Sequence, residues 1–380
     1  MIILKITNVK GNVAMDKFSP KHFAFLILGV SIVSMKTYPR VFIINGQRES
    51  WIAVIVSSIL IFLFYIYFIK NWINYNKINF VDLYRNAYGK KFGNVLLILF
   101  MVTCFFVLIE CASVEADAMH QNMMILTPKW YFLLFFIIPI IYVIRRDLVA
   151  IVTVTMIGIT LIMLAGINLG MLTISYKDPA FLFPVFAEGP TKRFFLCILE
   201  TLGLYGSISI TFPYLKEIKA PKKNMILYIV IAMIILIQIE IVSITGVLTT
   251  FTIERAGSIN YPKLLQTQLV SYFQFLDFGE LYVMLQMLGG WMLKYLIAFY
   301  AMLSILRMMN FNEKKIHLVT YIVSSIALIC SYFASRDSFI LFELLDIFQY
   351  ICLVNFVIIP FMAFFILNMK KKLQTFYESN

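Results

Sequence analysis

The sequence predicts an all-α membrane protein in which ten transmembrane helices form two inverted repeats of five (5+5). Hydrophobic residues make up 61% of the 380-residue chain and charged residues 14%, and the mean hydropathy is +0.88. A soluble domain cannot reach these values, because its surface must be polar. Ten apolar segments follow one another along the chain, and the first segment of each half is interrupted by glycine. These three observations define the predicted fold class.

The ten predicted spans are residues 22–44, 51–69, 92–109, 130–144, 148–176, 194–215, 224–253, 281–306, 316–335 and 340–369. A helix needs about 20 apolar residues to cross a hydrocarbon core. The second, third and fifth spans carry no charge, and the fifth is long enough to require tilt. The fourth is short and contains Pro139, and the sixth, seventh and eighth contain Glu200, Glu240 and Lys294. The ninth is free of acidic and basic residues except His, and two acidic residues open the tenth.

The first span permits two interpretations. Residues 23–33 are uncharged, and then Gly29, Ser31 and Ser34 are followed closely by Lys36 and Pro39. Eleven apolar residues cannot cross a core of about 30 Å. Either the helix is broken near the middle of the membrane, or its outer end simply lies at residues 36–40. Irregular backbone at membrane depth is tolerated where protein or a wet cavity satisfies it, and transporters place ligand sites at such breaks.

The distribution of basic residues predicts the topology. The N-terminus, alternate loops and the C-terminal tail hold 21 of the 32 Lys and Arg residues, so the positive-inside rule places both termini in the cytoplasm. We therefore expect a cytoplasmic segment at 1–21, one transmembrane domain at 22–369 and a cytoplasmic tail at 370–380. The net charge of +12 is spread over many short loops. Topology explains it, and we expect the lipid bilayer rather than nucleic acid as the partner.

The two halves, about 22–176 and 194–369, suggest a repeat. With five spans each, the second half is inverted relative to the first. Gly29 and Ser31 correspond to Gly203, Gly206 and Ser207, each in the first span of its half. Such a pair of interrupted helices indicates a binding site, where freed N–H groups attract a carboxylate and freed carbonyls an ammonium. The alternative is that these glycines only let helices pack closely.

Ionisable residues inside the membrane are expensive and usually have a partner or a task. Lys294 lies about halfway along its span, and we expect it to face the interior. There it would either pair with Glu200 or Glu240 or occupy a position where a carrier would bind a cation. Glu110 ends the predicted third span near the outer surface, where an interfacial carboxylate is the alternative to a ligand contact. No motif of a P-loop, zinc protease, redox dithiol or serine hydrolase is present. The five cysteines lie in apolar segments without the spacing of metal ligands. From these absences together we expect neither enzyme activity, nor a bound metal, nor a cofactor.

Several short motifs together resemble a known family. They are Gly29, Pro39 and Gly46-Gln-Arg-Glu-Ser-Trp-Ile52, then Thr127-Pro128, Phe183-Pro184-Val185, Tyr261-Pro262, Leu276-Asp277 and Gly289-Gly290-Trp291 with Lys294. In order and spacing, over about residues 17–369, they resemble the B subunits of spore germinant receptors, the spore permease family. Ser207 departs from the pattern, because family members often carry Glu there. The family is similar to the amino acid–polyamine–organocation carriers, which implies ten helices in a 5+5 inverted repeat with helices 1 and 6 discontinuous.

The resemblance implies a multi-pass subunit in the inner membrane of a spore that senses a small nutrient, an amino acid above all, together with A-type and lipoprotein C-type subunits. We expect the ligand between the two breaks, with aromatic walls from Phe106 and Tyr205 and fixed positive charge from Lys294. The predicted binding residues are Gly29, Ser31, Ser34, Phe106, Glu110, Glu200, Gly203, Tyr205, Gly206 and Lys294. The alternative functions are an amino-acid or polyamine transporter and a structural scaffold for the other subunits.

Overall fold

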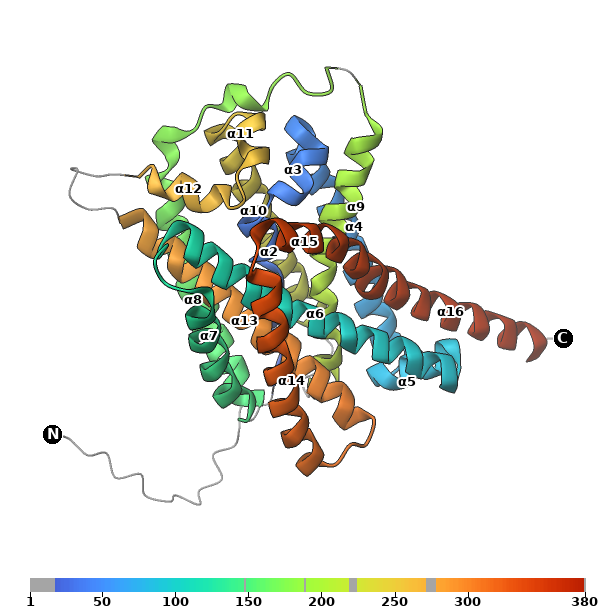
Figure 1. Ribbon diagram of the computed structural model, residues 1–380. Coiled ribbons are helices and arrows are strands. Elements are labelled where there is room, and N and C mark those ends of the chain that lie inside the picture. The colour runs from blue at the N-terminus through green and yellow to red at the C-terminus, as the bar shows by residue number, and fades with distance from the viewer. Residues whose placement is uncertain (1–17, 147, 188, 219–223, 271–277, 379–380) are drawn as a thin grey trace.

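Figure 1 shows the computed structural model, which describes residues 18–146, 148–187, 189–218, 224–270 and 278–378. In these residues the secondary structure is helical throughout, without strands. Most of the predicted segment 1–21 and the Leu276-Asp277 motif lie outside them. Figure 1 places helices α3, α11 and α12 on one face, which we call the loop face.

Eight helices of the described residues are long and apolar enough to cross a membrane. They are Arg40–Asn74, Lys90–Asn122, Leu148–Leu172, Lys192–Glu217, Met225–Thr250, Leu281–Met308, Glu313–Ser335 and Ser338–Lys372. This is two fewer than predicted for two reasons. Helix α7 (Lys129–Ile144) has only 16 residues, and the predicted first span is divided into short pieces. The chain is therefore a multi-pass membrane protein.

The first predicted span is broken. Helix α1 (Pro20–Ser31) starts with Pro20, and the Ser19 N–H donates to His22 Nδ1 at 3.2 Å. The chain leaves the helix at residues 32–33, where two β-branched side chains follow a serine, and residues of these types are weak helix formers. It resumes as α2 (Ser34–Thr37) and, after Pro39, as α3 (Arg40–Gly46). The predicted interruption is thus confirmed.

The predicted sixth span changes its geometry. Helix α9 (Lys192–Gly206), capped by Thr191, ends at Gly206. It continues as η4 (Ser207–Glu217), a 3-10 helix of 11 residues that contains Pro213. Runs of 3-10 helix longer than three or four residues are uncommon and often mark a functional hinge. Residues 207–215 are all buried, so this irregular segment lies in the interior.

The remaining elements complete the bundle. They are η1 (Gln47–Glu49), α4 (Ser50–Asn74), α5 (Phe80–Tyr88), α6 (Lys90–Asn122), α8 (Leu148–Leu172), η2 (Ile174–Tyr176), η3 (Pro179–Leu182), α10 (Met225–Thr250), α11 (Ile253–Ser258), α12 (Pro262–Gln268), α13 (Phe278–Met308), α14 (Glu313–Ser335), α15 (Ser338–Cys352), the π-helix η6 (Leu353–Ile358) and α16 (Ile359–Glu378). Helix α6 runs 13 residues beyond the predicted end at 109, and the tenth predicted span is interrupted by η6.

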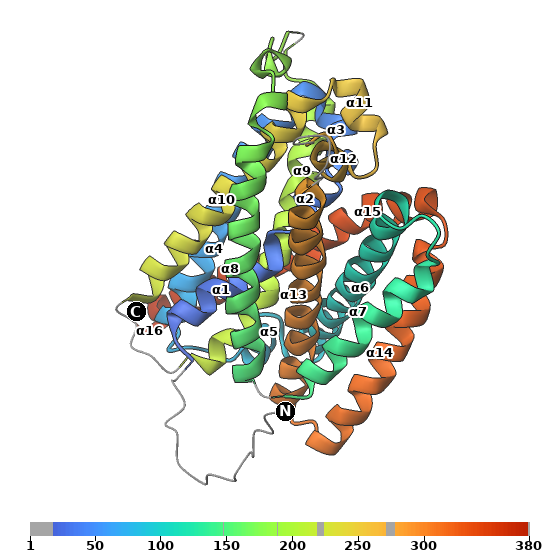
Figure 2. The ribbon, with the colours of Figure 1, turned by 90° about the vertical axis from the view of Figure 1, so that its left-hand side faces the viewer.

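The broken α1 lies at the centre of the molecule. It packs against α8, α10, α13 and η4, and Phe23, Leu26, Ile27 and Val30 are completely buried. Figure 2 shows α8 beside α13, with α6, α7 and α14 on the far side of α13. The irregular segment after α1 therefore has protein around it, as backbone at membrane depth requires.

Candidate ligand site at the broken helices

A buried ion pair lies where the first helix is broken. The Lys294 ammonium on α13 contacts the two Glu110 carboxylate oxygens on α6 at 2.7 and 2.9 Å. Both side chains are 2% exposed. Lys294 also donates to Ser34 Oγ at 2.5 Å, and the Ser34 hydroxyl donates to Glu110 Oε1 at 3.0 Å. The first residue of α2 is thus held by both charges.

Aromatic groups enclose this pair. Tyr38 donates from its hydroxyl to Glu110 Oε1, and its ring stacks on Trp291 with centroids 6.0 Å apart. The Lys294 ammonium lies 5.4 Å from the centre of the Trp291 ring, within the range of a cation–π interaction. Glu110 and Lys294 therefore neutralise each other, and the neutral groups of Ser34, Tyr38 and Trp291 stabilise both charges further, as a buried pair requires.

Two expectations about these charges are wrong. Lys294 does not pair with Glu200 or Glu240, because α6 and α13 pack side by side and bring Glu110 to it instead. Glu110 is also not at the end of its helix, because α6 continues to Asn122. Its side chain is in the protein interior rather than at the interface.

The glycines of the predicted site lie at close helix contacts. A Cβ on Gly29 would be 2.7 Å from Ile297 Cδ1 on α13. A Cβ on Gly203 would be 2.0 Å from the Gln349 carbonyl oxygen on α15, and one on Gly206 3.0 Å from Val357 Cγ2. Their packing role, the alternative considered above, is what this geometry supports. The Ser31 hydroxyl, also at the break, is buried and has no hydrogen-bond partner among the described residues.

Two of the other three predicted residues, Tyr205 and Glu200, have partners outside the ion pair. Tyr205 shares a hydrogen bond of 2.7 Å with Ser58 on α4. Glu200 accepts from Asn45 at 2.6 Å and from Tyr350 at 2.8 Å, between α3 and α15. Phe106 is 39% exposed and, together with Glu110, lines an apolar pocket of about 510 Å³ between α6, α14 and α15. The structure thus brings together Ser34, Glu110 and Lys294 from the predicted set, and it places Phe106 in one pocket with Glu110.

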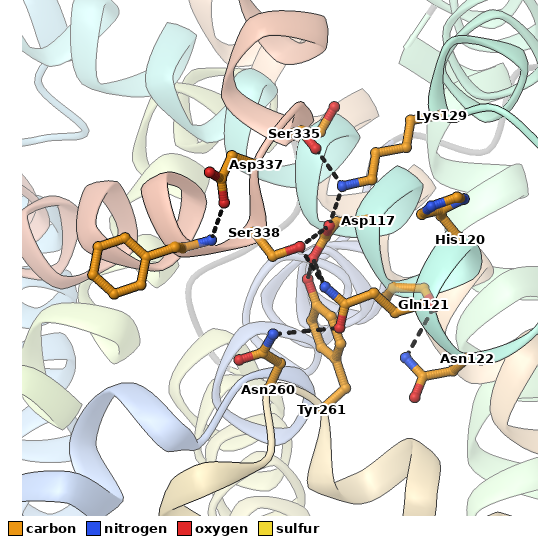
Figure 3. Close-up of polar contacts among 12 residues, drawn as sticks. Asp117, His120, Gln121, Asn122, Lys129, Asn260, Tyr261, Ser335, Asp337 and Ser338 are labelled. Carbon is orange, nitrogen blue, oxygen red and sulfur yellow. Dashed lines mark hydrogen bonds and ion pairs between the residues drawn. The ribbon is translucent and has the colours of Figure 1, made fainter. Parts of the chain in front are cut away.

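A second polar cluster, on the loop face, was not predicted (Figure 3). The buried Asp117 of α6 accepts from Lys129 at 2.6 Å, Ser338 at 2.7 Å and Tyr261 at 2.6 Å. Lys129 also donates to the Ser335 carbonyl oxygen. Burial, together with the adjacent Asp117 carboxylate, raises the pKa of Tyr261, so its phenol remains a donor. We call Asp117, Lys129, Tyr261 and Ser338 the Asp117 cluster, and it ties α6, α7, α12 and α15 together.

Sequence reasoning also missed Tyr38 and the acidic run in α6. Glu110, Glu115 and Asp117 are close together in sequence, and all three are buried. Placing the third span's end at residue 109 put Glu110 at the membrane boundary and left Glu115 and Asp117 outside the span. The available signal was the absence of a helix breaker between 110 and 122. The described residues contain no group of three or more His, Cys, Asp or Glu side chains arranged to hold a metal ion.

A comparison with protein families finds a match over most of the chain. The family model described as spore germination protein matches residues 17–340. No curated protein matches the chain.

Proposed function

The chain belongs to the spore germination protein family, and from this premise we propose that it is the membrane subunit of a germinant receptor that binds a small nutrient, an amino acid. It would reside in the inner membrane of the spore with both termini in the cytoplasm and act with A-type and lipoprotein C-type subunits. We further propose the ten-span 5+5 arrangement, in which α1–α3 and α9–η4 are the first and sixth spans. The two breaks and their central position support it.

The observation that carries this proposal is the Glu110–Lys294 pair on the broken helix. An amino acid carries both charges of that pair. Its ammonium can replace Lys294 at Glu110, while its carboxylate can accept from Lys294 and from the Ser34 hydroxyl. Such an exchange keeps every buried charge neutralised, which a ligand with one charge could not do.

The same exchange supplies a signal. Ser34 is the first residue of α2, so separating Glu110 from Lys294 changes what holds this short helix in place. A ligand shifts a conformational equilibrium only by its differential affinity for the two states. In the unliganded state Glu110 and Lys294 are paired. In the liganded state the nutrient would lie between them, and this change of conformation would be transmitted to the partner subunits.

Nutrient-triggered germination of spores carrying Lys294→Ala tests the proposal, with subunit abundance measured by immunoblot. At matched subunit abundance, we expect a nutrient response that is lost or displaced to higher concentration. Lys70→Ala, which removes an exposed charge at the end of α4, is the matched control and should respond normally. An unchanged response of Lys294→Ala would contradict the proposal. If the Lys294→Ala protein does not accumulate in the spore, Glu110→Gln provides the same test, because it changes the other member of the pair.

A further inference from the structure

A separate pocket of about 420 Å³ lies between α8 and α10, with α2 and α13 at its inner side. Three lysines line it: Lys36 of α2, Lys177 after η2 and Lys263 of α12. None of the described lining residues is acidic. Lys36 interacts electrostatically with Glu240 of α10, so the three ammonium groups and this one carboxylate leave an excess of positive charge.

Two polar side chains of the pocket have hydrogen-bond donors without an acceptor among the described residues. Gln286 is 6% exposed, and its Oε1 accepts from Lys36 at 3.4 Å. Its Nε2 donor has no hydrogen-bond partner among the described residues, nor does the hydroxyl of Ser243, which is 7% exposed. Buried donors without acceptors are rare in native structures. Ammonium, amide and hydroxyl donors around one cavity are the environment that an anion with several acceptor oxygens would satisfy.

Lys263 is positioned rather than free. Its ammonium donates to Gln266 Oε1 at 2.8 Å, and Gln266 is in turn fixed by the Gly246 carbonyl and the Thr250 hydroxyl of α10. Burial, with the neighbouring charges of Lys177 and Lys36, lowers the pKa of Lys263 to about 7. Holding these like charges close together costs free energy through their repulsion, and a bound anion would reduce that repulsion.

Apart from Gln238 of α10, the rest of the wall is apolar, and it opens toward the lipid. Ile162, Met163 and Ile167 of α8 face Ile235, Ile239 and Val242 of α10 across the pocket. Ile167 is 56% and Val242 55% exposed, and these exposed apolar side chains of membrane-spanning helices contact hydrocarbon in the bilayer. An occupant can therefore enter from the membrane with an apolar chain between α8 and α10 and its anionic group at the lysines.

We propose that this pocket binds the phosphate group of an anionic phospholipid, independently of the nutrient site. Basic pockets between transmembrane helices are a known mode of headgroup recognition. The phosphate would accept from Lys36, Lys177 and Lys263 and from the unpaired donors of Gln286 and Ser243. Because Lys36 belongs to α2, the bound lipid would stabilise the position of the same short helix that Ser34 anchors to the ion pair.

The test uses the full chain in nanodiscs of phosphatidylcholine, with bound lipid counted by native mass spectrometry during titration with dioctanoyl phosphatidylglycerol. We expect one retained phosphatidylglycerol per chain and affinity at least about fivefold weaker in Lys263→Gln, the effect of one lysine near a lipid surface. Lys263→Arg should restore binding. Lys192→Gln, which removes an exposed charge at the start of α9, should bind as the unchanged chain does.

Two controls complete the design. Thermal unfolding in detergent without phosphatidylglycerol shows whether Lys263→Gln is folded, and Lys177→Gln offers a second variant if it is not. Equal retention of phosphatidylcholine and phosphatidylglycerol, or equal binding by Lys263→Gln and Lys192→Gln, would overturn the proposal. Lysine-dependent binding of inorganic phosphate that displaces the lipid would overturn the lipid as the source of the anion. Germination of Lys294→Ala spores is a separate measurement, so each proposal can fail without the other.

Discussion

The Glu110 carboxylate and the Lys294 ammonium depend on each other, because neither is exposed enough to be stabilised by water. Removing one partner of a buried pair leaves an uncompensated charge and costs about 3–5 kcal/mol, whereas replacing both is often nearly neutral. We therefore predict that Lys294→Met alone lowers the unfolding temperature strongly. The double variant Glu110→Gln with Lys294→Met should be more stable than either single variant. Thermal unfolding of the purified protein measures this.

Additive effects of the two substitutions would contradict this prediction, because they would mean that the two groups do not interact. Ser34→Ala is an informative companion. It removes one hydroxyl that links both charges to α2 but leaves the pair intact, so its cost should be smaller than that of Lys294→Met.

Protonation of Lys263 gives the anion site a dependence on pH. Lys177 and Lys36 face Lys263, and Glu240 interacts with Lys36. Because the pKa of Lys263 is lowered to about 7, this group is largely neutral at pH 8.5 and gains its charge as the pH falls through 7. We predict that phosphatidylglycerol binds about fivefold more tightly at pH 6 than at pH 8.5, one lysine charge being worth about that much.

Native mass spectrometry after equilibration at each pH, or titration of a fluorescent phosphatidylglycerol, measures the affinity. Lys263→Arg is the control, because arginine stays protonated over this range and its affinity should change less. Tighter binding at pH 8.5 would contradict the predicted direction of the pH dependence and would show that Lys263 does not bind the phosphate.

At the scale of helices, α9 and α15 are in contact through Gly203. An added Cβ there would be 2.0 Å from the Gln349 carbonyl oxygen, a backbone atom that cannot move without its helix. We predict that Gly203→Ala separates the two helices and destabilises the protein by about 1–3 kcal/mol or more, the cost of overpacking. Gly170→Ala in α8 is the matched control, because nothing lies within 4 Å of its added Cβ. The unfolding temperatures of the two variants should differ clearly, and equal values would show that α9 does not approach α15 so closely.

The two helix breaks could be predicted from sequence because their causes are local. Glycine, serine and proline within a few residues weaken a helix wherever they occur, and the structure breaks at residues 32–33 and changes helix type after Gly206. The π-helix η6 has no comparable signal in residues 353–358. The length of α6 was missed because Glu110 was interpreted as the membrane boundary.

Side-chain partners could not be predicted, because they depend on how helices rotate against one another. Lys294 was correctly expected to lie in the interior, but the facing acid is decided by the packing of α6 on α13. The same holds for Lys36, Lys177 and Lys263, which are separated widely in sequence and converge where α2, α12 and the end of α8 meet. A single sequence contains the charges of both sites but not their distances.

On the scale of the whole molecule, the Asp117 cluster closes the loop face above the ion pair. Asp117 and Glu110 both lie on α6, and the cluster joins this helix to α7, α12 and α15 (Figure 3). A path from the loop face along α6 to Glu110 and Lys294 would pass these contacts or separate them. Loss of the Asp117 charge should therefore make the centre of the protein more accessible.

We predict that Asp117→Asn increases labelling of Cys111 by a water-soluble maleimide, in a variant whose four other cysteines are replaced by alanine. Cys111 is completely buried and lies next to Glu110, so labelling reports opening toward the ion pair. A hydrogen bond to a charged group contributes about 1.5–3 kcal/mol, which corresponds to a labelling rate about 10 to 100 times higher. Asp337→Asn is the matched control, since Asp337 only caps α15 beside the cluster. Equal rates in both variants would mean that the Asp117 cluster stabilises the fold without restricting access to the site.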